Sequence, residues 1–241
     1  MTNRLLALLA ATAVTGVIAG GAWVSKSRAS GSDYEPLLEP ANFVAVIDNP
    51  YFPLPVGRTL VYEGIKDGQS QVDTVTVTDQ TRVIEGITAR MVSDVSTHNG
   101  TLLEKTFDFY AQDKQGNVWY LGEDTTAFLA NGKTDTSGSW MAGVNDAEPG
   151  LIMEANPQIP DAYRQEFLAG QAEDTAWVVE RGGTVTVPYC KLRNTLKTLE
   201  ATRIEPGSYD LKVYAPGIGI VLEQSLSGAP EVASLVSVTG P

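Results

Sequence analysis

Three acidic residues have the clearest potential for chemistry in this sequence: Glu104, Asp108 and Glu123. Glu104 and Asp108 are four residues apart, so a strand would place both on one face, and Glu123 is expected directly opposite Asp108 on the next strand. Two carboxylates that face each other across a ladder repel, so they must share a proton, meet an arginine or bind a cation. A proton-sharing pair could act as general acid and base, whereas the three acids together offer the oxygen ligands that suit calcium. A solvated or arginine-paired face is the structural alternative.

Other side chains are expected to surround these acids. Tyr110 shares the strand face of Asp108, and Trp119 is expected to join that face from the neighbouring strand. Arg164, on a later strand, is a candidate to neutralise the pair. Trp140 lies in a long loop, where it could stack on a ligand or simply pin the loop by its own burial. The sequence thus predicts two sets, a ligand-binding set of Tyr110, Trp119, Trp140 and Arg164 and a metal-binding set of Glu104, Asp108 and Glu123.

Most other catalytic chemistries lack their residues here. The chain has one histidine, His98, which is predicted at a hairpin tip, and one cysteine, Cys190, which is expected to be a buried, inert thiol. No serine-hydrolase, zinc-protease, phosphate-loop or EF-hand motif occurs. Carboxylate, tyrosine, tryptophan, methionine and arginine chemistry remains.

Two predicted hairpins position the acids. Asn99-Gly100 favours a tight turn that pairs His98 with Thr101, and a second turn spans 114–117. Pairing Asp113 with Val118 across the second turn puts Asp108 opposite Glu123. The first turn is expected to place Asp94 opposite Lys105 and Val92 opposite Phe107. Strand 102–112 then has an apolar face, joined by Val92, Val118 and Tyr120, and an acidic face, joined by Met91, Val95, Trp119 and Leu121.

Short segments with period-two alternation, separated by glycine-rich turns, indicate a mostly-β protein. We expect a single antiparallel curved sheet or open β-barrel with a long loop-rich insertion over 125–161. Residues 191–200 fit either a strand or a short helix. The predicted organisation is a signal peptide or N-terminal anchor over 1–29, an extended proline-rich lead-in over 30–58, and the antiparallel β domain over 59–241.

The N-terminus indicates export. Arg4 precedes an apolar run from Leu5 to Val24, followed by small residues that would allow cleavage after Ala22 or Ala29. The length of the run also fits an uncleaved anchor, which would attach the protein to a membrane. Either alternative places the domain in the periplasm or outside the cell. The net charge of -12, without a basic cluster, argues against a nucleic-acid partner.

Several strings resemble a group of secreted bacterial proteins of uncharacterised function. They are Tyr110-Ala-Gln-Asp113, Gly116-Asn-Val-Trp-Tyr120, Gly122-Glu-Asp124, Gly138-Ser-Trp-Met-Ala-Gly143, Tyr163-Arg-Gln-Glu166 and Tyr214-Ala-Pro-Gly-Ile-Gly219. The resemblance runs from about Pro50 to the C-terminus and implies no catalytic residues. The closing strands are also similar to those of LolA-like open β-barrels, a fold that holds or shuttles apolar ligands.

The leading hypothesis from the sequence is an exported, non-catalytic binding protein for a small apolar ligand or a divalent cation. One alternative is a carboxylate-dependent hydrolase or lyase that uses Asp108 and Glu123, and another is a structural component of the cell envelope. Calcium is the cofactor that the acids would suit, although nothing in the sequence requires one.

Overall fold

The computed structural model describes residues 34–66, 68–227 and 231–241. The leader predicted over 1–29 lies outside these residues, so both its cleavage and its anchoring remain predictions. In the part of the chain that the structure does describe, no helix has the length and apolar character needed to span a bilayer.

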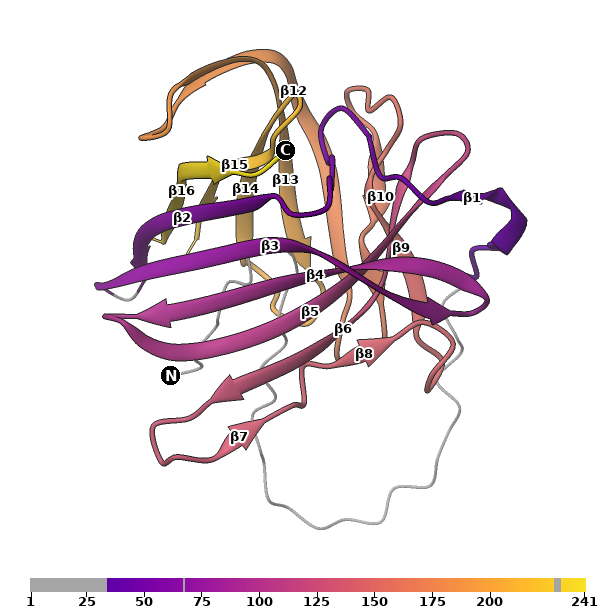
Figure 1. The fold of residues 1–241 in the computed structure, drawn as a ribbon, viewed down its shortest axis with the longest axis horizontal. Coiled ribbons are helices and arrows are strands. Elements are labelled where there is room, and N and C mark those ends of the chain that lie inside the picture. Colours follow the sequence, from indigo (N-terminus) through magenta and orange to yellow (C-terminus); the bar gives the residue numbers. More distant parts are fainter. Residues whose placement is uncertain (1–33, 67, 228–230) are drawn as a thin grey trace.

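Antiparallel strands make up most of the described chain and wrap into a nearly closed barrel (Figure 1). This confirms the expected mostly-β class. Strands β2 to β6 lie side by side across one wall, and β12 to β15 form the wall behind them. In order around the barrel, the strands are β10 (Ala162–Arg164), β12 (Asp174–Thr186), β13 (Lys191–Thr202), β14 (Tyr209–Ala215), β15 (Gly219–Ser225), β16 (Val232–Thr239), β2 (Thr59–Lys66), β3 (Gln69–Ile84), β4 (Ile87–His98), β5 (Thr101–Asp113), β6 (Val118–Phe128), β9 (Glu148–Met153) and β11 (Glu166–Phe167).

Local sequence explains the long hairpins of the front wall. Asn99 and Gly100 both have positive φ, 47° and 77°, so the β4–β5 turn forms where the sequence predicts it and His98 pairs with Thr101. Along β3, buried and half-buried residues alternate from Gln71 to Thr78, because one face lines the barrel interior.

The barrel closes at two seams. At the first, β16 pairs with β2, so the last strand of the chain meets the first long one. At the second, β10 pairs with β12 and β11 pairs with β9, and only Gln165 separates β10 from β11. A glycine permits close backbone approach at each seam: a Cβ on Gly64 would collide with the carbonyl of Val232, and one on Gly150 with the backbone of Gln165.

The lead-in covers one end of the barrel. It carries the turn η1 (Pro40–Asn42) and the short strand β1 (Phe43–Val44), which pairs with the end of β5. Beyond β1, Ile47, Phe52 and Leu54 are buried in the main core. The Gln112 side chain accepts hydrogen bonds from the backbone N–H groups of residues 48 and 49, both at 2.9 Å, and so ties the lead-in to β5.

Two local expectations require correction or refinement. Residues 191–200 lie in strand β13, so the helical alternative is wrong, and no α-helix occurs among the residues described. Cys190 is exposed rather than buried, because it lies at the tip of the β12–β13 hairpin, beside the Thr186–Lys191 pair that ends the ladder. The loop-rich insertion contains the short strands β7 (Thr134–Asp135) and β8 (Trp140–Met141), which both pair with β6.

Candidate functional site

The centre of the candidate site is a pair of carboxyl groups inside the barrel. Asp108 of β5 lies directly opposite Glu123 of β6, and each side chain is only 1% exposed. The hydroxyl of Tyr120 lies 2.8 Å from Asp108 Oδ1 and 3.1 Å from Glu123 Oε2. The pair is therefore buried away from bulk water, and one tyrosine hydroxyl group contacts both of its members.

A bulge produces this arrangement. Val118 pairs with Gln112, not with Asp113 as the sequence suggested, so the ladder starts one residue out of the predicted register. A shift between Phe109 and Tyr110 then restores the pairing of Asp108 with Glu123. Gly122 makes the bulge feasible, because it has a φ of 139° and a Cβ there would press on the backbone of β8. The bulge also turns Tyr120 to the same side as Glu123.

A second bulge, between Ser96 and Thr97, changes the pairs predicted for β4 and β5. Asp94 lies opposite Thr106, and Val92 lies opposite Asp108. The acidic face of β5 is correct as predicted, since Glu104, Asp108 and Tyr110 are all buried. Its expected neighbours are exchanged: Val92, Val118 and Tyr120 pack in the main interior core, whereas Met91, Trp119 and Leu121 pack with Phe109 in a second cluster on the outer face. Val95 pairs with the exposed Lys105 and is likewise not on the acidic face.

More buried acids join these three than the sequence indicated. Asp94 of β4 interacts electrostatically with Asp73 of β3, with Glu104 and Asp108 of β5, and with Glu223 of β15. Neither carboxyl oxygen of Asp94 has a hydrogen-bond partner among the described residues. Within the same described ranges, one oxygen each of Asp108, Glu123 and Glu223 also lacks a partner. We call Asp73, Asp94, Glu104, Asp108, Glu123 and Glu223 the acidic wall.

Two buried lysines partly balance the acidic wall. The amino group of Lys212 lies 2.8 Å from Glu200 Oε2, and both side chains are almost completely buried. Lys66 lies 3.5 Å from Glu231 at the end of β2. Neither lysine was predicted, because a single lysine in a strand ordinarily indicates a solvent-facing position.

Burial governs the protonation of the acidic wall. It raises the pKa of Asp108 and of Glu104 to about 7, and that of Asp73 to about 6. Burial and the neighbouring carboxylates raise the pKa of Asp94 and of Glu123 well above the usual range. Burial would lower the pKa of Lys212, but Glu200 and Glu223 outweigh it and raise that pKa. Several of these acids therefore carry a proton at neutral pH while Lys212 stays charged.

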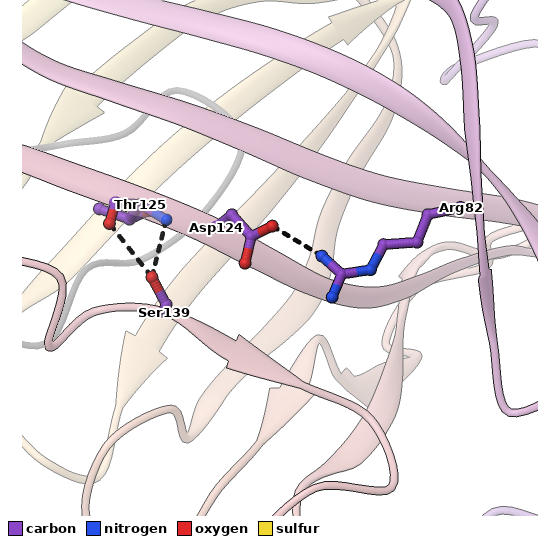
Figure 2. A network of polar contacts seen from close by, with 4 residues as sticks. All are labelled: Arg82, Asp124, Thr125 and Ser139. Carbon is purple, nitrogen blue, oxygen red and sulfur yellow. Dashed lines mark hydrogen bonds and ion pairs between the residues drawn. The ribbon is translucent and has the colours of Figure 1, made fainter.

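Aromatic rings flank the carboxyl pair on the side of the covered end. Tyr110 and Tyr120 stack with ring centroids 4.8 Å apart, and Trp140 meets Tyr120 edge-on at 5.2 Å. Trp140 is buried, and it reaches this position because β8 pairs with β6 at Glu123. Ser139, next to Trp140 in the chain, ties this segment to β6. Its hydroxyl accepts a hydrogen bond from the Thr125 N–H at 2.9 Å and donates one to the Thr125 carbonyl at 3.1 Å (Figure 2).

On the outer face of β6, an acidic residue is exposed to solvent and paired with a cation, unlike the buried Glu123 on the inner face. Asp124, next to Glu123 in the chain, points outward and forms an ion pair with Arg82 of β3 (Figure 2). Both partners are about half exposed, at 54% and 44%. Asp124 has a cation partner and solvent, whereas Glu123 is buried and forms no ion pair with any residue that the structure describes, so adjacent acids on one strand lie in opposite environments.

Two of the predicted ligand-binding residues do not lie with the acids. Trp119 is on the outer face, where its indole N–H donates to Asp113 Oδ2 at 3.0 Å. The Arg164 guanidinium lies over the rings of Tyr34 and Phe167, at 5.1 and 4.5 Å from their centroids. Tyr110 and Trp140 do lie beside the carboxyl pair.

The predicted metal ligands Glu104, Asp108 and Glu123 share the inner wall. Across residues 34–66, 68–227 and 231–241, however, no three His, Cys, Asp or Glu side chains form a group that could hold a metal ion as they stand. Calcium binding by these three residues stays a prediction.

Comparisons with known proteins add little. No protein-family model and no curated protein matches the chain. One solved structure is similar, that of a presumed lipoprotein from Parabacteroides distasonis ATCC 8503, with 13% sequence identity, a TM-score of 0.45, and coverage of 79% of this chain and 99% of that one.

Proposed function

We propose that this protein is an exported, non-catalytic binding protein that holds a small ligand with an apolar part inside the barrel. The observation that carries the proposal is the composition of the interior, where the acidic wall, with oxygens that no described residue engages, adjoins a layer of buried tyrosines. A stable interior normally satisfies its polar groups, so a place where several remain open is suited to receive donors from a ligand.

The barrel supports this role mechanically. The lead-in covers one end with Ile47, Phe52 and Leu54, the first seam is closed by the pairing of β16 with β2, and at the second seam β10 and β11 follow each other in the chain. A rigid wall of paired strands can hold carboxyl groups in place before a ligand arrives, which reduces the entropy cost of binding.

Export belongs to the same proposal and rests on the leader-like residues before position 30. Expression in a Gram-negative host, followed by fractionation and N-terminal sequencing, would test it. Recovery in the cytoplasm with an intact N-terminus would contradict export.

Native mass spectrometry of the purified protein, combined with thermal shift, would test binding. We expect a co-purifying mass that organic extraction removes, and a rise in Tm when a neutral apolar dye such as Nile red, or calcium chloride, is added. A protein that carries no adduct and responds to neither probe would leave the proposal without support.

A second candidate function is carboxylate-dependent hydrolysis or elimination, favoured by the Asp108–Glu123 pair alone. Burial raises the pKa of both acids, and their mutual repulsion opposes ionising them together, so the pair can hold one proton between them as an acid–base pair does. A panel of p-nitrophenyl esters and glycosides would test this function. Turnover that Asp108→Asn and Glu123→Gln abolish, and Asp124→Asn leaves intact, would establish it.

A further inference from the structure

We propose that the ligand carries a primary ammonium group, which binds between Asp94, Asp73 and Glu223 while its aliphatic chain lies along Ile65 and Val232. The inference rests on the proposed binding function and deepens it, since it names the class of ligand as an aliphatic amine.

The first observation is that the carboxyl group of Asp94 is buried without hydrogen bonds from the described residues. Its side chain is 5% exposed, and both its carboxyl oxygens lack a hydrogen-bond partner within the described part of the chain. Leaving a buried acceptor unsatisfied costs about 1–3 kcal/mol, and more for a charged group. An ammonium group supplies three N–H donors and a positive charge, and so meets both requirements at once.

The second observation is the set of charged groups that face Asp94. They are acidic on every neighbouring strand, with Asp73 on β3, Glu104 and Asp108 on β5, and Glu223 on β15. Two buried lysines also act on this set: Lys66, which is paired with Glu231, and Lys212, which is paired with Glu200. The cluster therefore holds more acids than cations, and a cationic ligand would allow one of its protonated carboxyl groups to ionise.

The third observation is a small pocket that is lined by two acids of this cluster. It lies between β2 and β3 on one side and β15 and β16 on the other, and Asp73 and Glu223 line it. Its volume of about 10 Å³ is room for about one water-sized group, which an ammonium group matches and a trimethylammonium group exceeds. Ile65 and Val232 also line the pocket and are 58% and 39% exposed, so an alkyl chain would find an apolar path from the surface.

Aromatic side chains complete the environment. The ionisation of Tyr62 and of Tyr110 is affected by Asp94, so both phenols are near it, and both are buried. Tyrosine rings attract a desolvated cation through their π faces, and this contributes to affinity without adding a formal charge.

Isothermal titration calorimetry with three probes of equal chain length would test the inference: octylamine, 1-octanol and octyltrimethylammonium. We expect the wild-type protein to bind octylamine at least tenfold more tightly than either other probe. Because the ammonium group favours ionised carboxylates, binding should release about one proton, measured as a dependence of the heat on the ionisation enthalpy of the buffer.

Asp94→Asn and Glu223→Gln should each weaken octylamine binding at least tenfold and leave 1-octanol binding unchanged. Asp124→Asn is the matched control, since it removes an acid from the outer face. A thermal melt of each variant shows whether it is folded. If one of the two variants fails to fold, the other still tests the inference.

Three other outcomes would contradict the amine inference, and the last of them would also contradict the proposed binding function. If 1-octanol binds as tightly as octylamine and Asp94→Asn has no effect, the amine inference falls while the binding function stands. If calcium alone competes with octylamine and binds more tightly, the site belongs to a metal ion and the inference falls. If no probe, calcium included, binds the wild-type protein, the inference and the proposed function both lose their support.

Discussion

Asp108 and Glu123 face each other across the β5–β6 ladder inside the barrel, and one tyrosine hydroxyl lies within hydrogen-bond distance of both. A hydroxyl group has one proton to donate. The hydroxyl can therefore donate fully to only one carboxylate, and the contact with Asp108 is the shorter, at 2.8 Å against 3.1 Å. Burial raises the pKa of Glu123 well above its usual range, and a protonated Glu123 can donate to the Tyr120 oxygen while Tyr120 donates to Asp108.

Stability should fall as the pH rises from about 4 to 8. Asp73, Glu104 and Asp108 titrate near pH 4 when unfolded, but burial raises the pKa of each to about 6 or 7 in the folded protein. The folded state thus binds more protons over this window, and their stabilising contribution, complete below about pH 4, is lost as the pH passes the folded values. Thermal melts should give a Tm at pH 8 roughly 5 °C or more below that at pH 5. A Tm that rises steadily to pH 8 would be inconsistent with buried, protonated acids.

Glu123→Gln should flatten this pH dependence. The amide keeps a donor for the Tyr120 hydroxyl but cannot ionise, so the free energy of unfolding should match wild type at pH 5 and exceed it by about 1 kcal/mol at pH 8. Urea denaturation at the two pH values would measure the difference. Asp124→Asn, on the outer face of the same strand, should leave the pH dependence of the free energy of unfolding unchanged.

Tyr120→Phe should destabilise the protein by about 1–2 kcal/mol, because it removes a hydroxyl that contacts both carboxyl groups while filling nearly the same volume. It should also raise the pKa of Asp108 further, since the hydrogen bond from Tyr120 lowers it. Carbonyl-region infrared spectra recorded against pH would follow that titration. An unchanged Asp108 midpoint would show that the hydroxyl does not engage this acid in solution.

Lys212→Met should be the most damaging of the single changes, at about 3–5 kcal/mol near pH 7. It leaves Glu200 buried without the amino group that lies 2.8 Å away. The double variant with Glu200→Gln should recover a large part of the loss, because no charge is then left unpaired. Chemical denaturation of the two single variants and the double variant gives the coupling energy. Additive losses would mean that the ion pair is not coupled in solution.

The hairpins and the inward direction of β5 were predictable because they depend on local rules. Asn99-Gly100 specifies its turn through backbone conformation alone, and strict alternation puts Glu104, Asp108 and Tyr110 on one face. The opposition of Asp108 and Glu123 was also predicted, although from a register that is off by one at the turn and that the bulge at Gly122 corrects.

The parts that sequence could not supply depend on those bulges and on distant strands. One extra residue reverses every side chain beyond it, and this is how Trp119 and Tyr120 exchanged faces relative to the prediction. Asp94 joins the acidic wall because the bulge between Ser96 and Thr97 places it opposite Thr106 rather than Lys105, and Glu223 joins it because β15 meets these strands inside the barrel, a long-range relationship that no local pattern encodes. Arg164 was the natural candidate for the buried cation, yet Lys212, from a strand almost fifty residues later in the chain, lies among the acids.

The first seam has a consequence for how the chain is made. Because β2 pairs with β16, the partner of Thr59 is Thr239. Nearly the whole domain must therefore be synthesised before that edge of the sheet is covered. Until then the backbone groups of β2 along that side are open to strands of other molecules, a known route to aggregation. A chain that crosses a membrane before it folds would pass through this vulnerable interval outside the crowded cytoplasm.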